Sequence, residues 1–129
     1  MQVIATRVYE RRAARLLSAE ERVATEAAIV ARPDAWPVIQ GTGGARKARI
    51  ALPGRGKRGG ARVIYFVSMA GGVIAFFDIY AKNVKEDLSN ADKRNLKAAI
   101  AEIVAALGDD AAGQAAGGGG AGSRGPSAR

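Results

Sequence analysis

The pattern of apolar and polar residues predicts three consecutive strands in the middle of the chain. Residues 46–52 (RKARIAL) alternate between two kinds of side chain, which is the period-two pattern of a half-buried strand. Residues 62–67 (RVIYFV) and 73–82 (VIAFFDIYAK) are rich in β-branched and aromatic residues, which favour strands. Short glycine-containing connections join the three segments. We therefore predict an antiparallel meander.

The first of these strands is expected to have two unlike faces. Its alternation places Ala48, Ile50 and Leu52 on one side. Lys47 and Arg49 project from the other side. The sheet is therefore expected to have an apolar core face and a cationic open face.

Helices are predicted on either side of the meander. Residues 3–8 (VIATRV) are expected to form a short first strand, and 9–17 (YERRAARLL) a helix. A second helix is predicted to begin at the capping box 18–21 (SAEE) and to end before Pro33. A last helix is predicted to begin at 89–92 (SNAD), a short-armed capping box. Its apolar stripe consists of Leu96, Ile100, Ile103, Val104 and Leu107.

The predicted element order is β-α-α-β-β-β-α. It corresponds to an α+β fold with the helices packed on one face of the meander sheet. We expect residues 1–107 to form one folded domain. Residues 108–129 are rich in Gly, Ala and Ser and offer almost no large apolar side chains, so a flexible tail is predicted there.

The positive charge of the chain is concentrated in the meander. The net charge is +8, and no acidic residue lies between Asp34 and Asp78. The basic residues in that interval are Arg46, Lys47, Arg49, Arg55, Lys57, Arg58 and Arg62. Like charges gathered in this way repel one another unless an anion binds them. The pattern favours a nucleic acid, an anionic membrane surface or an acidic protein as partner, and we favour phosphates.

The composition excludes several kinds of site. There is no cysteine, which excludes disulfides and thiolate metal sites, and no histidine, the commonest general base and metal ligand. We therefore expect neither a metal nor a cofactor. No apolar run is long enough for a membrane span, and residues 1–17 are too charged for a signal peptide. A cytoplasmic protein is expected.

Strand geometry indicates how the basic residues act together. Lys47 and Arg49 are two positions apart, so they project from one face roughly 7 Å from each other, close to the spacing of successive phosphates. Arg62, Tyr80 and Lys82 can converge on the same surface. The alternative is a strand edge that carries basic residues only as protection against aggregation. The long interval without acidic residues favours the phosphate interpretation.

The segment 53–60 (PGRGKRGG) connects the first two strands of the meander. No helix follows it and it lacks the GxxxxGK[ST] order, so it is not expected to be a nucleotide-binding P-loop. We interpret it as a basic arm that follows a nucleic-acid backbone through Arg55, Lys57 and Arg58, with Arg46 beside it.

Two tyrosines and one aspartate on these strands also suggest functions. Tyr65 and Tyr80 carry a hydroxyl as well as a ring and are candidates for stacking on a base. Asp78 interrupts the last strand, either as the partner of a nearby arginine or on an exposed face.

The central motifs resemble the RelE/HigB group of bacterial type II toxins, which are small basic proteins encoded beside an antitoxin. The shared motifs are GTGG, a K-x-R strand, the loop GRGKRGG, a strand RVIY and the ending YAKNVKEDL. They cover about half of the predicted domain, and the preceding helices fit in order. The resemblance implies the β-α-α-β-β-β-α fold predicted above.

The resemblance also implies an mRNA interferase that enters the ribosomal A site and cleaves messenger RNA during translation. In that group the ribose 2′-OH attacks the adjacent phosphate and leaves a 2′,3′-cyclic phosphate and a 5′-OH. The basic pair of the group falls on Lys47 and Arg49, and its transition-state arginine falls on Arg62. The basic end of the last strand falls on Lys82, with Lys85 near it.

This chemistry is compatible with a site that lacks histidine. Arginine stays charged and stabilises the extra negative charge of the phosphorane, so Arg49 and Arg62 are expected to hold the phosphate. A lysine among like charges releases its proton more readily, so Lys47 or Lys82 is expected to transfer protons.

The resemblance implies a cognate antitoxin, a HigA-like helix-turn-helix DNA-binding protein, and the ribosome with its messenger RNA as partners. An acidic or amphipathic antitoxin segment is expected to cover the cationic face or to pack beside residues 9–31. Two alternatives stay open. The ParE branch shares the fold but poisons gyrase without cutting RNA, and a basic domain can also bind RNA without cutting it.

Overall fold

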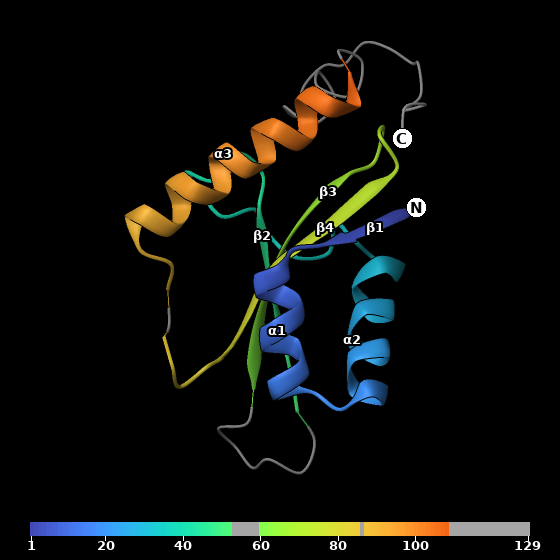
Figure 1. Cartoon of the computed structure of the whole chain (residues 1–129), viewed down its shortest axis with the longest axis vertical. Coiled ribbons are helices and arrows are strands. Elements are labelled where there is room, and N and C mark those ends of the chain that lie inside the picture. Colours follow the sequence, from blue (N-terminus) through green and yellow to red (C-terminus); the bar gives the residue numbers. More distant parts are fainter. Residues whose placement is uncertain (53–59, 86, 109–129) are drawn as a thin grey trace.

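The computed structural model describes residues 1–52, 60–85 and 87–108 (Figure 1). The strands of this part are β1 (Gln2–Ala5), β2 (Arg46–Ile50), β3 (Ala61–Ser68) and β4 (Val73–Ala81). The helices are α1 (Arg7–Leu16), α2 (Ala19–Ala31) and α3 (Asn90–Leu107). The predicted α+β class and the order β-α-α-β-β-β-α are confirmed.

The strands form one mixed sheet in the order β1-β4-β3-β2. β2, β3 and β4 pair antiparallel, which confirms the meander. β1 lies parallel to β4 at the sheet edge, with Gln2 opposite Val73 and Ala5 opposite Phe76. Because β4 continues to Ala81, its second half has no strand on its outer side in the described part of the chain.

One face of the sheet packs against α1 and α2. Val63, Tyr65 and Phe76 of the sheet share a buried cluster with Tyr9 of α1 and Ile29 of α2. The rings of Tyr9 and Phe76 stack with their centroids 5.2 Å apart. This cluster is the larger part of the core.

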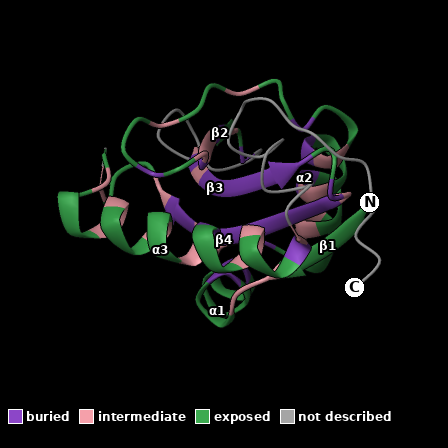
Figure 2. Ribbon diagram, turned by 90° about the horizontal axis from the view of Figure 1, so that it is seen from above, coloured by how far each residue is buried: buried purple, intermediate pink, exposed green. Residues whose placement is uncertain are grey.

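The opposite face packs against α3, so the prediction that the helices lie on one face is wrong. Ile64 and Phe66 of β3 share a second cluster with Ile100 and Leu96 of α3. The physical reason is that β3 carries apolar residues at nearly every position, and a strand that is apolar on both faces needs cover on both. Figure 2 shows β3 and β4 buried in the centre of the molecule.

Capping boxes fix the beginnings of two helices as predicted. Ser18 and Glu21 form both hydrogen bonds of the box at α2. Ser89 and Asp92 form the same pair of hydrogen bonds at α3.

The first helix begins earlier than predicted. The Thr6 hydroxyl accepts a hydrogen bond from the Tyr9 N–H at 3.0 Å and donates one to the Phe77 carbonyl at 2.8 Å. Thr6 is thereby the N-cap of α1, which ends β1 at Ala5 and places Val8 in the helix instead of the strand.

The last helix ends at the predicted domain boundary. α3 stops at Leu107, and Gly108 follows with a φ of +96°, a conformation that favours glycine. The predicted tail lies outside the described residues apart from Gly108 and stays a prediction. None of the helices in the described ranges is both long and apolar enough to cross a bilayer.

Candidate functional site

Three adjacent strands place basic and aromatic side chains in one row. Arg49 of β2 lies directly opposite Arg62 of β3, and Arg62 lies directly opposite Tyr80 of β4. Directly opposed residues project from the same face of a sheet. The row therefore presents two guanidinium groups side by side, next to the first residues of β3.

A second row lies two residues further along the strands. Lys47 is opposite Ile64, and Ile64 is opposite Asp78. Ile64 packs with α3, so both rows belong to the face that α3 covers in part. Arg49 is exposed, and Lys47 and Arg62 are half-buried. The structure thus brings Lys47, Arg49 and Arg62 together, and we call these three residues the cationic surface.

The charges of the cationic surface have little compensation. Lys47 Nζ lies 3.5 Å from a carboxylate oxygen of Asp87, whose side chain is 84% exposed. An ion pair with so exposed a partner contributes little. Arg62 donates to the backbone carbonyl of Ala61 at 3.3 Å. Within the described residues no other carboxylate forms an ion pair with the cationic surface.

The two lysines after β4 have different surroundings. Lys82 is exposed, and its backbone N–H donates to the Gly60 carbonyl at 2.9 Å, which holds it beside the start of β3. Lys85 Nζ lies 3.3 Å from Asp92 and 4.8 Å from the centre of the Tyr80 ring. The Ser89 N–H, with a further contribution from Lys85, holds the pKa of Asp92 below its ordinary value. Lys85 is therefore engaged, whereas Lys82 is open to a ligand.

Tyr80 closes the row with a buried hydroxyl. The residue is 4% exposed, and its hydroxyl has no hydrogen-bond partner among the described residues. Burial raises the pKa of this hydroxyl, and the charge of Arg62 opposes that effect. Because the ring is buried beneath Lys85, the prediction that it stacks on a base is wrong.

A comparison with known protein families adds to this geometry. The family model described as the RelE toxin of the RelE/RelB toxin–antitoxin system matches residues 1–119. The chain belongs to the RelE toxin family. It is therefore a toxin of a toxin–antitoxin system, with a cognate antitoxin as partner. The family that the sequence motifs indicated is confirmed.

Two predicted RNA-binding residues of this RelE toxin form hydrogen bonds that hold the fold together. Tyr65 is completely buried, and its hydroxyl donates to the Pro33 carbonyl at 2.6 Å. Arg46 projects from the α1–α2 face, where its guanidinium donates to the Trp36 carbonyl at 2.6 Å. The prediction that Tyr65 stacks on a base is wrong, because the ring is buried. Arg46 is half-buried and holds the segment between α2 and β2, and its predicted RNA contact stays a prediction.

Arg55, Lys57 and Arg58 lie outside the described residues, since the structure describes none of residues 53–59. Their predicted part in binding a nucleic-acid backbone stays a prediction. Gly60, the first residue described after this segment, would bring a Cβ to 3.3 Å from the Ile50 carbonyl, so little space is left between the ends of β2 and β3.

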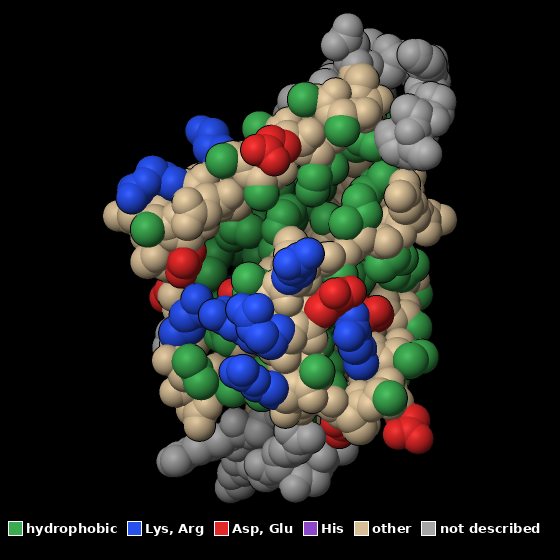
Figure 3. Space-filling model, in the orientation of Figure 1, with side chains coloured by type: hydrophobic (Ala, Val, Ile, Leu, Met, Phe, Trp, Pro, Cys, Tyr) green, Lys and Arg blue, Asp and Glu red, His purple; other side chains and the backbone are tan. Residues whose placement is uncertain are grey.

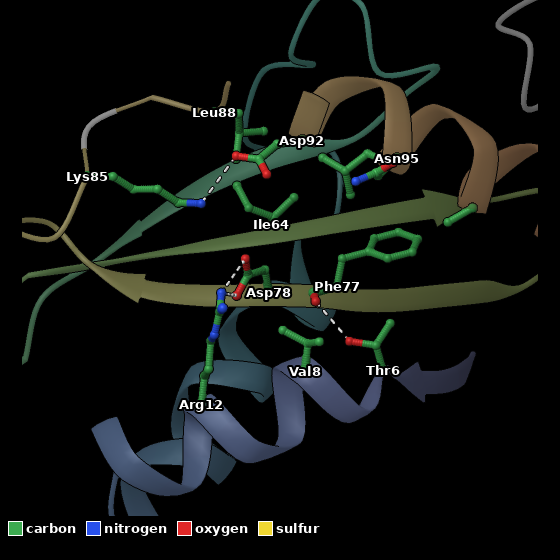
Figure 4. A pocket seen from close by; sticks show the side chains of 12 residues that line it. Thr6, Val8, Arg12, Ile64, Phe77, Asp78, Lys85, Leu88, Asp92 and Asn95 are labelled. Carbon is green, nitrogen blue, oxygen red and sulfur yellow. Dashed lines mark hydrogen bonds and ion pairs between the residues drawn. The ribbon is translucent and has the colours of Figure 1, made fainter. Parts of the chain in front are cut away.

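Three carboxylates face basic residues of the RelE toxin, and sequence reasoning named only Asp78 among them. Asp78 binds Arg12 of α1 through both carboxylate oxygens, at 2.8 and 2.9 Å, which settles the alternative left open for it (Figure 4). Asp87 faces Lys47, and Asp92 faces Lys85. For Asp87 and Asp92 the signal was the acidic character of the chain after Lys85. Lys47 and Asp87 are 40 residues apart, so no local pattern joins them.

Proposed function

We propose that this RelE toxin is a ribosome-dependent endoribonuclease that cuts messenger RNA and so inhibits translation. The observation that supports this proposal is the cationic surface, in which Lys47, Arg49 and Arg62 meet on one sheet face. Among the described residues, the exposed carboxylate of Asp87 is the one that pairs with it. Such a surface matches a phosphodiester, because it supplies several positive charges over the span of neighbouring phosphates.

In the proposed reaction the nucleophile belongs to the RNA, and side chains of the toxin act on the phosphate and on the protons. The ribose 2′-OH attacks the adjacent phosphorus while a base removes its proton, and the bond from phosphorus to the 5′-oxygen breaks. The departing 5′-oxygen takes up a proton, which leaves a 2′,3′-cyclic phosphate and a 5′-OH. Arg49 and Arg62 stabilise the charge that grows on the phosphate oxygens. Lys47 and Lys82 are the proposed proton carriers, with Lys82 the more exposed of the two.

The ribosome and its messenger RNA are the proposed substrate complex, and the antitoxin is proposed to be a HigA-like DNA-binding protein. A site with few enclosing walls depends on another molecule to align the scissile phosphate. The decoding site of a translating ribosome would do so, since it holds messenger RNA in a fixed path. The cytoplasm, where translation takes place, is the proposed location.

Primer extension on a reporter messenger RNA in a reconstituted translation reaction tests this proposal. Parent toxin should produce new 5′ ends that require the ribosome, and Arg62→Ala should abolish them. Arg32→Ala is the matched control, because Arg32 is an exposed arginine at the end of α2 and its loss should leave the pattern unchanged.

Other outcomes would replace the proposal. Growth arrest with intact messenger RNA and stalled gyrase cleavage complexes would identify a ParE-like poison. Salt-dependent RNA binding without any cleavage on translating ribosomes would identify a binding module.

A further inference from the structure

A cleft separates α1 from α3 on the side where β1 has ended. It has a volume of about 370 Å³, and its floor is formed by Ile64 and Phe77 of the sheet. Val8 of α1 lines one side (Figure 4). Leu96 and Ala99 of α3 also line the cleft. Figure 3 shows this apolar hollow open to the surface between the two helices. The cleft is therefore a surface groove with an apolar interior.

Charged pairs border the cleft, and two of their residues also line a second cavity. Arg12 pairs with Asp78 at 2.8 Å on one border, and Lys85 pairs with Asp92 at 3.3 Å on the other. A second cavity of about 350 Å³ also has Arg12 and Lys85 in its lining and extends along the outer side of β4 past Ile79. The two cavities therefore lie next to each other along the half of β4 that lacks a neighbouring strand, with Arg12 and Lys85 in the lining of both.

The helix beside this groove has a strongly basic surface. The exposed basic residues of α1 are Arg7, Arg11, Arg12 and Arg15, and its one acidic residue is Glu10. Among the described residues, Arg12 alone of these arginines has a carboxylate partner. Figure 3 shows basic side chains gathered over α1 next to the apolar hollow. An apolar groove beside unpaired arginines fits a ligand that is apolar on one side and acidic on the other.

Two occupants from the chain itself fit this surface poorly. Residues 109–129 contain no Val, Ile, Leu, Met or aromatic residue, so they offer no large apolar side chain for the cleft. A second copy of the chain would bring another +8 of charge against the arginines of α1. The groove therefore calls for a different chain with carboxylates.

We propose that the groove between α1 and α3, with the arginines of α1, is the docking surface for an acidic amphipathic segment of the antitoxin. The apolar side chains of that segment enter the cleft, and its carboxylates face Arg7, Arg11 and Arg15. This proposal rests on membership of a toxin–antitoxin family and not on the proposed RNA cleavage. Because Lys85 borders both cavities and lies over Tyr80, the bound segment reaches the margin of the cationic surface without covering it.

Isothermal titration of the purified toxin with the antitoxin encoded beside it tests the apolar part of the surface. Val8→Glu should weaken binding about 10-fold or more, the loss typical of one central interface residue. Val23→Glu is the matched control, because Val23 is an exposed valine on α2 away from the groove and should bind like the parent. Ala99→Glu, at a residue of α3 that lines the cleft, should weaken binding in the same way.

Charge reversal tests the basic part. Arg11→Glu should weaken binding and make it less sensitive to salt, whereas Arg94→Glu, an exposed arginine of α3 outside the groove lining, should change neither. Thermal melts of each variant verify that it is folded. In growth assays, Val8→Glu should stay toxic but escape neutralisation by the antitoxin.

Parent-like affinity in Val8→Glu, Ala99→Glu and Arg11→Glu would overturn the proposal. A dimer of the free toxin that Val8→Glu converts to a monomer would overturn it in favour of a second copy. Because affinity is measured without RNA, failure of the proposed cleavage would leave this result unchanged, and the two proposals fail separately.

Discussion

The two faces of the sheet differ in how completely helices cover them. On the α1–α2 face, Tyr9, Tyr65 and Phe76 are fully buried, and the Tyr65 hydroxyl is hydrogen-bonded. On the α3 face, packing ends at Tyr80, whose hydroxyl has no partner among the described residues, and the cationic surface begins there. The α1–α2 face therefore supplies stability, whereas the α3 face leaves one end of β2 and β3 uncovered, where the basic side chains are accessible. Five substitutions test this division.

The largest loss of stability is expected from Phe76→Ala. The side chain is fully buried and stacks on Tyr9, so its removal should lower the free energy of unfolding by about 3–5 kcal/mol. Urea denaturation followed by circular dichroism measures this loss. Val23→Ala, at an exposed position, should stay within about 0.5 kcal/mol of the parent. A loss below about 1 kcal/mol for Phe76→Ala would show that this face is loosely packed.

Arg49→Ala should change stability little and the rate of cleavage strongly. The residue is exposed and has no ion pair in the described residues, so its loss should change stability by about 0.5 kcal/mol or less. On the proposed function it should lower the rate of messenger RNA cleavage about 10²- to 10³-fold, which corresponds to about 2.7–4 kcal/mol of transition-state stabilisation. Single-turnover cleavage on programmed ribosomes measures the rate. Unchanged cleavage would exclude Arg49 from the site.

A matched pair of tyrosine substitutions compares the faces directly. Tyr65→Phe leaves the buried Pro33 carbonyl without its donor and should cost about 1–3 kcal/mol of stability. Tyr80→Phe removes a hydroxyl without a partner among the described residues and should leave stability unchanged or raise it slightly. Denaturation in urea measures the free energy of unfolding of both variants. Equal losses in the two variants would show that the Tyr80 hydroxyl is bound after all.

The smallest change in stability is expected from Asp92→Asn, at the start of α3. Because the folded-state pKa of Asp92 is lowered, its carboxylate adds stability above the ordinary pKa of aspartate, and this is lost as pH falls through the lowered value. Asp92→Asn should therefore melt at a lower temperature than the parent at pH 7. The gap should close in acid, where both side chains are neutral. Asp87→Asn, with its exposed carboxylate, should show no gap at either pH.

Local signals in the sequence predicted most of the elements. Ser18 with Glu21 and Ser89 with Asp92 are short-range capping pairs, and the structure contains both. The period-two alternation of β2 placed Lys47 and Arg49 on one face, because a strand has no other way to arrange them. These features depend on residues a few positions apart.

Contacts between segments far apart in the chain could not be predicted from the local sequence pattern. The parallel pairing of β1 with β4 and the placement of α3 on the second face join segments that are far apart in the chain. The apolar run at the centre of β3 did contain a signal for cover on both faces, although alternation in β2 pointed to one open face. Tyr65 was misassigned because its partner, Pro33, is 32 residues away.

The turn between β3 and β4 holds both ends of the described fold. The Gln2 N–H donates to the Gly72 carbonyl at 2.7 Å, and a Cβ at Gly71 would come within 2.8 Å of the Leu107 side chain. The Arg62–Tyr80 row lies at the other end of β4, seven residues from Val73, or about 23 Å at the rise of a strand. A fluorophore or surface tether attached at Gln2 or at Gly108 therefore stays clear of the cationic surface. A short linker between the two ends is the natural starting point for a circular permutant.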